Sequence, residues 1–297
     1  MIAEAASRAP AQAARRRRPD ADLLLIAPAV LATLALFIGP FLYGLALSFQ
    51  PYGKDPTWYA SYLKFVTVSR GQLAIWNSLR LAIPATLVDL LVALPIAYRM
   101  RRPLRGQRLI TTLLVIPMTL GSVLIAEGML QFLGPAGWIN KALVTTHLVR
   151  EPVQFIHNYL GVLISLVISD FPVVFLVLLG YASGIDPDID RAARMLGAGY
   201  LKRVRRITLP LMAPGIATAA ALSFVATFSV FPTATMVGQP AGETYVVALA
   251  AWQAAYEHFD YSEASAIALL MAALMLAFVL LMMVLRDRVY RMPSAGR

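Results

Sequence analysis

Three acidic residues stand inside long apolar stretches of this chain: Asp89, Glu127 and Asp170. Ionisable residues are costly at such depth in a membrane, and they usually face a bundle interior, a cavity or a partner. No Lys or Arg falls at an equivalent depth to neutralise them. Two interpretations are open: a pathway that accepts cations, or local bonding, by Asp170 to backbone groups freed near Pro172 and by Asp89 to a neighbouring helix.

Small hydroxyl residues share these apolar stretches. Ser223 and Thr227 join the three acids as candidates for a substrate path, and Ser165 and Ser229 are further candidates. Their alternative role is structural, because small polar residues commonly serve contacts between membrane helices.

No arrangement of residues predicts catalysis, metal binding or a bound cofactor. The absence of cysteine excludes disulfides, thiol nucleophiles and cysteine-ligated metals. A phosphate-binding loop of the form G-x-x-x-x-G-K-[ST] is also missing, so any ATP hydrolysis that drives this chain must occur on another chain. The histidines lack metal-ligand spacing and are expected on surfaces, and a polar cluster near the sixth apolar stretch is expected to be a solvated rim. These residues are His147, His157 and His258, and Glu257, Asp260 and Glu263 beside the last of them.

The composition places all these residues in a membrane protein. Of the 297 residues, 59% are hydrophobic and only 14% are charged, whereas soluble domains carry about a quarter charged residues. A helix needs about 20 apolar residues to cross a bilayer, and the apolar runs do not alternate as barrel strands do. The sequence therefore predicts an all-α integral membrane protein with six transmembrane helices, at residues 23–48, 81–98, 109–133, 160–181, 211–237 and 264–285.

The basic residues indicate the orientation. A net charge of +10 alone would fit a nucleic-acid-binding protein. However, 20 of the 26 Lys and Arg residues precede the first stretch, follow the sixth, or lie between the second and third or the fourth and fifth. The positive-inside rule makes that side cytoplasmic, with both termini on it, and no nucleic acid is expected as a partner.

The predicted domain organisation follows from these spans. Residues 1–21 are expected to be a disordered cytoplasmic tail, 22–288 the six-helix domain, and 289–297 a cytoplasmic C-terminal tail. A cleaved signal peptide is the alternative for the N-terminus, but the apolar run is too long for one.

The connection at residues 186–210 has the pattern of an ordered structure. Asp186 followed by Pro187 is typical of a helix start, and Asp188 and Asp190 place negative charge in its first turn. One apolar stripe follows at helical spacing, formed by Ile189, Ala192, Ala193 and Leu196. Glycines then permit a turn into a second helix. Periodicity leaves two roles open: docking of a cytoplasmic partner, or lying on the membrane surface.

The stretch "RAARMLGAGYLKRVRRITLPLMAPG" resembles the EAA loop of permease subunits in binding-protein-dependent ABC importers. Six residues match the spaced pattern of that family: Ala192, Ala193, Gly197, Ile207, Leu209 and Pro210. Arg191 stands where the family usually has Glu. Two further stretches, "NSLRLAIPATLVDLLVALPIAY" and "LPLMAPGIATAAALSFVATFSVFPTATMVGQPAGET", are similar to the second and fifth spans of spermidine/putrescine-type permeases and their iron and sulfate relatives.

The resemblance implies a type I ABC importer permease fold in a bacterial inner membrane, with a non-catalytic role. It implies two ATPase subunits that carry ATP and Mg, a second permease subunit, identical or homologous, and an extracytoplasmic solute-binding protein. The expected coupling residues are Ile189, Leu196, Arg191 and the six matched positions, with Ala192 and Ala193 facing the ATPase.

The substrate is expected to be a small cationic solute such as a polyamine. The alternatives are iron, sulfate, phosphonate or a sugar carried in the same way. A self-contained secondary transporter is the alternative from another functional class, although the chain lacks the internal repeat that many of those have. A membrane-anchored scaffold is a third class, but it would not need buried acids.

Overall fold

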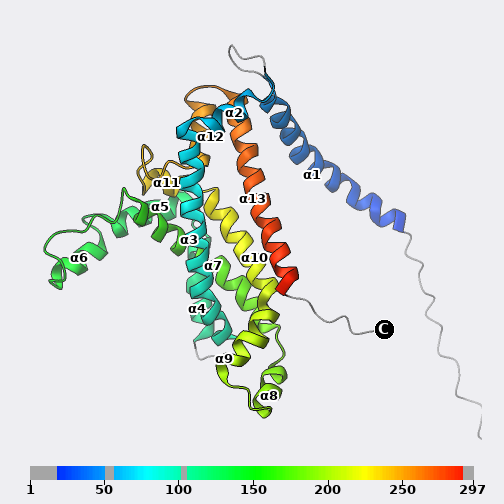
Figure 1. The fold of residues 1–297 in the computed structure, drawn as a ribbon, viewed down its shortest axis with the longest axis vertical. Coiled ribbons are helices and arrows are strands. Elements are labelled where there is room, and N and C mark those ends of the chain that lie inside the picture. Colours follow the sequence, from blue (N-terminus) through cyan, green and yellow to red (C-terminus); the bar gives the residue numbers. More distant parts are fainter. Residues whose placement is uncertain (1–18, 51–56, 102–105, 290–297) are drawn as a thin grey trace, which may run out of the picture. The chain divides into compact units, whose positions relative to one another are not determined.

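The computed structural model describes residues 19–50, 57–101 and 106–289, and every regular element among them is a helix (Figure 1). Five of these helices are long and apolar enough to cross a membrane, and a sixth span results if one bent pair is counted together. Most of the predicted N-terminal tail, and residues 290–297 of the C-terminal tail, lie outside the described residues.

Helix α1 (Pro19–Ser48) belongs, up to residue 46, to a compact unit separate from the remainder of the chain. It begins inside the predicted tail, so residues 19–21 are helical rather than disordered. Proline suits the first position of a helix, because its missing N–H would have no partner there.

Three helices form the centre of the second unit. Helix α3 (Ser69–Met100) packs against α7 (Tyr159–Ser183) and α10 (Leu209–Phe228), and α13 (Tyr261–Val289) packs along α10. Small buried side chains on α3 allow this close approach; they are Ala74, Ala82, Ala85, Ala93 and Ala97. Helix α3 begins twelve residues before the predicted second span, whereas α7 and α13 agree with their predictions within four residues at each end.

The predicted third span, 109–133, is not one continuous helix. Helix α4 (Gln107–Met118) ends beside Pro117, and α5 (Gly121–Leu133) leads into α6 (Trp138–Thr145). The two parts are bent by 102°. Gly121 has a φ of +71°, a conformation that glycine adopts at little cost. Hydropathy predicted the apolar length correctly but contains no signal for this backbone angle.

The predicted fifth span, 211–237, ends nine residues early. Helix α10 stops at Phe228, and a short helix α11 (Pro232–Met236) follows after a break. Proline cannot donate a helical hydrogen bond, so Pro232 starts a new helix rather than continuing the old one. At its other end, α10 is continuous with α9 (Tyr200–Arg203) through a π-helical turn, Val204–Thr208.

Two helices that the sequence did not predict, α12 (Val247–Tyr256) and α2 (Ala60–Thr67), lie at the end of the unit opposite to α9 (Figure 1). Helix α12 packs on α13 and α3, near the short helix α2. Asn77 of α3 donates to the backbone carbonyls of Gly242 and Tyr245 at 3.3 and 3.1 Å.

Burial raises the pKa of the Tyr245 phenol. The Arg70 guanidinium, 4.6 Å from the centroid of the Tyr245 ring, acts in the opposite direction and lowers that pKa.

Candidate functional site

A buried polar layer divides the core formed by α3, α7 and α10. The buried apolar side chains make two clusters, one containing Leu81 of α3 and Phe228 of α10, the other containing Ala97 and Met212 of the same helices. On each of the three helices, buried polar residues stand between the two clusters: Thr86 and Asp89 on α3, Asp170 on α7 and Ser223 on α10. Ser165 and Thr227 are also buried, within the part of the core that contains the first cluster. The structure thus brings together four of the five residues expected to form a path.

Asp89 lies at the centre of this layer. It is fully buried, and the Ser223 hydroxyl is 3.5 Å from its Oδ2 and 3.3 Å from Thr86 Oγ1. Ser223 also lies beside Asp170. Asp89 Oδ1 and Asp170 Oδ2 are buried without a hydrogen-bond partner in the described part of the chain. Each buried oxygen without a partner loses the hydrogen bonds that water would give it.

Asp170 lines a cavity of about 410 Å³ between the two broken helices. Met118 and Gly121 line it on one side, and Ser229 and Phe231 line it on the other. Non-helical backbone is tolerated at membrane depth only where it is buried in protein or lines a cavity. Both helix breaks therefore border the cavity that the Asp170 carboxylate borders.

The remaining two candidates differ in their surroundings. Thr227 lines the same cavity and donates to its own helix, at the carbonyl of Ser223, 2.7 Å away. Glu127 is exposed on α5 and accepts a hydrogen bond from Gln131 at 3.2 Å. It does not line the cavity, so the structure separates Glu127 from the buried acids.

A second candidate site is the loop between α7 and α10, where helix α8 (Pro187–Met195) has the expected capped start. The Asp186 side chain accepts from the Asp188 N–H at 2.8 Å. Gly197 has a φ of +75°, which makes the turn into α9. Helix α8, the turn at Gly197 and helix α9 follow one another along the loop, and α9 continues directly into α10.

The predicted apolar stripe of α8 divides between two faces. Ala192 is exposed, as are Ile189 (41%) and Leu196 (88%), but Ala193 is only 8% exposed. Ala193 therefore packs against its own chain and does not face outward as expected. Regular spacing alone could not separate the two alanines, because adjacent residues lie about 100° apart on a helix.

The other residues expected to couple the loop to an ATPase differ in their exposure. Arg191 is exposed and pairs with Asp188 on its own helix at 2.6 Å. Ile207, Leu209 and Pro210 are half-buried where the loop enters the membrane span. An ion pair between exposed side chains contributes little to stability, so Arg191 remains available at the surface.

Sequence reasoning missed the role of Asp190. Its carboxylate is buried and pairs with three arginines from three helical segments: Arg101 at 3.5 Å, Arg194 at 3.0 Å and Arg203 at 3.1 Å. The sequence suggested only a favourable charge in the first turn of α8. No local signal indicated the pairs with Arg101 and Arg203, because these arginines reach Asp190 only through the folding of the chain.

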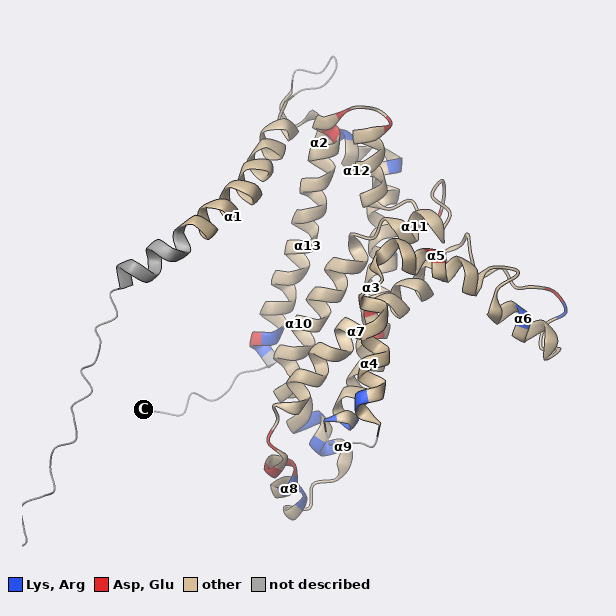
Figure 2. Cartoon of the chain, turned by 180° about the vertical axis from the view of Figure 1, so that it is seen from behind, with Lys and Arg blue, Asp and Glu red and all other residues tan. Residues whose placement is uncertain are grey.

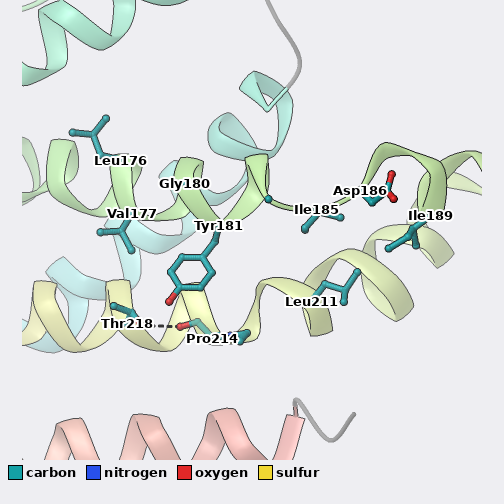
Figure 3. A pocket seen from close by; sticks show the side chains of 11 residues that line it. Leu176, Val177, Gly180, Tyr181, Ile185, Asp186, Ile189, Leu211, Pro214 and Thr218 are labelled. Atoms are coloured by element: carbon teal, nitrogen blue, oxygen red, sulfur yellow. Dashed lines mark hydrogen bonds between the residues drawn. The ribbon is translucent and has the colours of Figure 1, made fainter. Parts of the chain in front are cut away.

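An apolar groove of about 780 Å³ lies where α8 joins the membrane helices (Figure 3). Residues of α7 and α10 form most of it, and Ile189 of α8 borders it. The Tyr181 ring lies against Gly215, where an added Cβ would come within 2.5 Å of the ring. No buried acid lines this groove, so its chemistry differs from that of the cavity beside Asp170.

The expected surface residues are partly as predicted. His147, His157 and His258 are exposed, but Asp260 is buried and accepts from the Glu263 N–H at 2.9 Å. Asp260 therefore caps the start of α13 and is not part of a solvated rim.

Basic residues gather at the end of the unit that carries the loop (Figure 2). The exposed members on α8, α9, the π-helical turn and the end of α13 are Arg191, Arg194, Lys202, Arg205, Arg206 and Arg288.

The sequence was compared with known families and relatives. Residues 89–292, more than half of the chain, match the family described as binding-protein-dependent transport system inner membrane component. The spermidine/putrescine transport system permease protein PotB of Haemophilus influenzae is 32% identical over 165 residues, 55% of this chain and 58% of that protein. PotB of Escherichia coli is 28% identical over 163 residues, 54% and 59% of the two chains. The match thus spans less than two thirds of these relatives.

Other relatives carry different names. The molybdenum transport system permease protein ModB of Haemophilus influenzae is 31% identical over 179 residues, 60% of this chain and 76% of that protein. A chain of a bacterial alginate ABC transporter, crystallised with its alginate pentasaccharide-bound periplasmic protein, matches with a TM-score of 0.77 at 20% identity. That match covers 92% of this chain and 96% of the other, and it agrees with the expected type I permease fold.

Proposed function

Because the chain belongs to the family of binding-protein-dependent transport system inner membrane components, we propose that it is a permease subunit of an ABC importer. It lies in a bacterial inner membrane with both termini in the cytoplasm. Two ATPase subunits supply ATP hydrolysis, and a second permease, identical or homologous, completes the membrane path. An extracytoplasmic binding protein delivers the solute.

The observation that carries this proposal is the exposed outer face of α8. The apolar side chains of Ile189 and of the C-cap residue Leu196 are exposed, although leaving apolar surface in water is unfavourable. Helix α8 itself lies at the basic end of the second unit (Figure 2). A docked ATPase would cover that face. When the ATPase subunits close on ATP, they would then move α8 as a rigid body.

Purification tests the role directly. The chain, extracted in mild detergent from cells that express its operon partners, should co-isolate with an ATPase. Solute uptake into vesicles should require ATP hydrolysis and the binding protein. Uptake by this chain alone, driven by a proton or sodium gradient, would establish the secondary-transporter alternative.

The proposed solute is a small cation such as a polyamine. The Asp89 and Asp170 carboxylates support this, since neither forms an ion pair within the described residues. A cation in the 410 Å³ cavity would supply the missing positive charge. The names of the PotB relatives support this proposal, whereas the ModB and alginate relatives are named for molybdenum and alginate transport. Iron, sulfate, phosphonate and a sugar therefore stay as alternative solutes.

Identification of the ligand on the cognate binding protein tests the solute. Mass spectrometry of the purified binding protein should find an amine or another small cation. A bound oxyanion or sugar would contradict the cation proposal and would leave the permease role intact.

A further inference from the structure

Asp190 connects the loop helix to two other parts of the chain. Its Oδ1 lies 3.1 Å from Nε of Arg203 in α9, and its Oδ2 lies 3.5 Å from Nη2 of Arg101 at the end of α3. Arg194 of α8 itself adds a contact of 3.0 Å. One carboxylate therefore joins α8, α9 and α3.

Burial separates this cluster from the surface pairs of the loop. The side chains of Asp190, Arg101 and Arg203 are 8%, 7% and 11% exposed, whereas Asp188 and Arg191 are 72% and 75% exposed. Removing one partner of a buried pair leaves a charge without compensation, which is strongly unfavourable. The buried contacts thus resist separation of the three segments, and the exposed pair does not.

Arg101 is in turn fixed to α3. Its guanidinium lies 4.2 Å from the Tyr98 ring centroid, and its Nη2 donates to the Tyr98 hydroxyl at 3.2 Å. Asp89 lies twelve residues earlier on the same helix, about 18 Å away at 1.5 Å per residue. A displacement of α8 can therefore reach the polar layer through one continuous helix.

We propose that Asp190 is the positioning residue that transmits movement of α8 to α3 and α9. The outer face of α8, with Ile189, Ala192 and Leu196, binds the ATPase, and the inner face, with Asp190 and Ala193, holds the membrane helices. The inference rests on the proposed permease function, and it adds the route by which ATPase docking on α8 changes the substrate path.

The test uses the full importer in proteoliposomes with its ATPase and binding protein. Asp190→Asn keeps the side-chain shape and removes the charge. ATPase co-isolation should stay at the wild-type level, while solute imported per ATP hydrolysed should fall about 10-fold, within the range of typical coupling effects. Asp188→Asn, on the same helix but exposed, is the matched control and should match wild type in both measurements.

A second set of variants separates transmission from general damage. Arg101→Gln should reproduce the loss, and the double variant should be no worse than either single change, because both remove the same connection. Asp190→Glu, which keeps the charge, should retain part of the wild-type amount of solute imported per ATP hydrolysed. If Asp190→Asn is poorly folded, Arg101→Gln alone decides.

Three outcomes would overturn the inference: a wild-type transport ratio in Asp190→Asn, or in Arg101→Gln if that variant has to decide; additive losses in the double variant; or loss of ATPase binding in Asp190→Asn. Failure of the wild-type chain to co-isolate any ATPase would instead contradict the proposed function itself.

Discussion

At the scale of single residues, the buried acids oppose stability and favour a role in transport. A fully buried carboxylate with an unpartnered oxygen, as at Asp89, costs more than an apolar side chain in the same place. Such a cost is usually found at functional sites, where activity opposes stability. The two acids should therefore respond differently from the buried polar residues that only hold the fold.

Asp170→Asn should reduce uptake of the cationic solute about 10- to 100-fold, because a hydrogen bond to a charged group is worth about 1.5–3 kcal/mol. Uptake of radiolabelled solute into vesicles measures this. Glu127→Gln is the control, since Glu127 is exposed and outside the cavity, and its uptake should be unchanged. Equal uptake by both variants would contradict the role of Asp170.

Asp89→Leu should raise the free energy of unfolding by about 1 kcal/mol, because it removes a buried group with an unsatisfied oxygen, while it abolishes uptake. Asn77→Leu on the same helix should do the reverse and destabilise by about 1–3 kcal/mol, since Asn77 donates to two carbonyls. Thermal unfolding of the purified variants in detergent would show the opposite signs. Destabilisation by Asp89→Leu would mean that the carboxylate has a structural role.

At the scale of elements, the two neighbouring alanines of α8 face different surroundings. Ala192→Leu should leave the thermal stability unchanged and weaken ATPase co-isolation, because Ala192 is exposed on the docking face. Ala193→Leu should lower stability by about 1–3 kcal/mol through overpacking, since Ala193 is 8% exposed. Equal effects of the two changes on both measurements would argue against distinct faces.

The bend between α4 and α5 depends on one glycine. Gly121→Ala should destabilise the protein by about 1 kcal/mol, because a Cβ disfavours its positive φ. No neighbour would clash with the added methyl group, so the effect reports the backbone alone. Gly128→Ala, in helix α5 with equally open surroundings, should be neutral or stabilising.

The elements also show what the sequence could and could not predict. Apolar length located α7 and α13 well, because each is one uninterrupted run. The breaks at 119–120 and 229–231 depend on local backbone angles, which hydropathy does not report. Helix α12 was missed because its ten residues are too short to register as a span.

The candidate site also contains residues that the sequence could predict and contacts that it could not. Asp89 and Asp170 could be predicted because each lies in the middle of an apolar run. Their contact with Ser223 could not, because it depends on how three helices pack together. Glu127 had the same signal and lies apart, because the bend at Gly121 takes α5 out of the predicted span. The pairing of Asp190 with Arg101 joins residues that are distant in the chain, and no local pattern predicts it.

At the scale of the whole molecule, the proposed function requires that α8 and α9 lie on the ATPase side of the membrane. The gathered basic residues support this through the positive-inside rule. The chain contains no cysteine, so single-cysteine variants can report the orientation without background. Lys202→Cys in α9 and Glu257→Cys at the end of α12 replace exposed residues, and these two helices lie at opposite ends of the second unit (Figure 2).

In right-side-out vesicles, a membrane-impermeant thiol reagent should label Glu257→Cys at once, and Lys202→Cys only after the membrane is opened. Addition of the ATPase to opened membranes should then protect Lys202→Cys, because a docked partner covers the loop, and should leave Glu257→Cys reactive. The inverse labelling pattern would place α8 outside the cell. No ATPase could then reach it, and the permease assignment would fail together with the transmission route through Asp190.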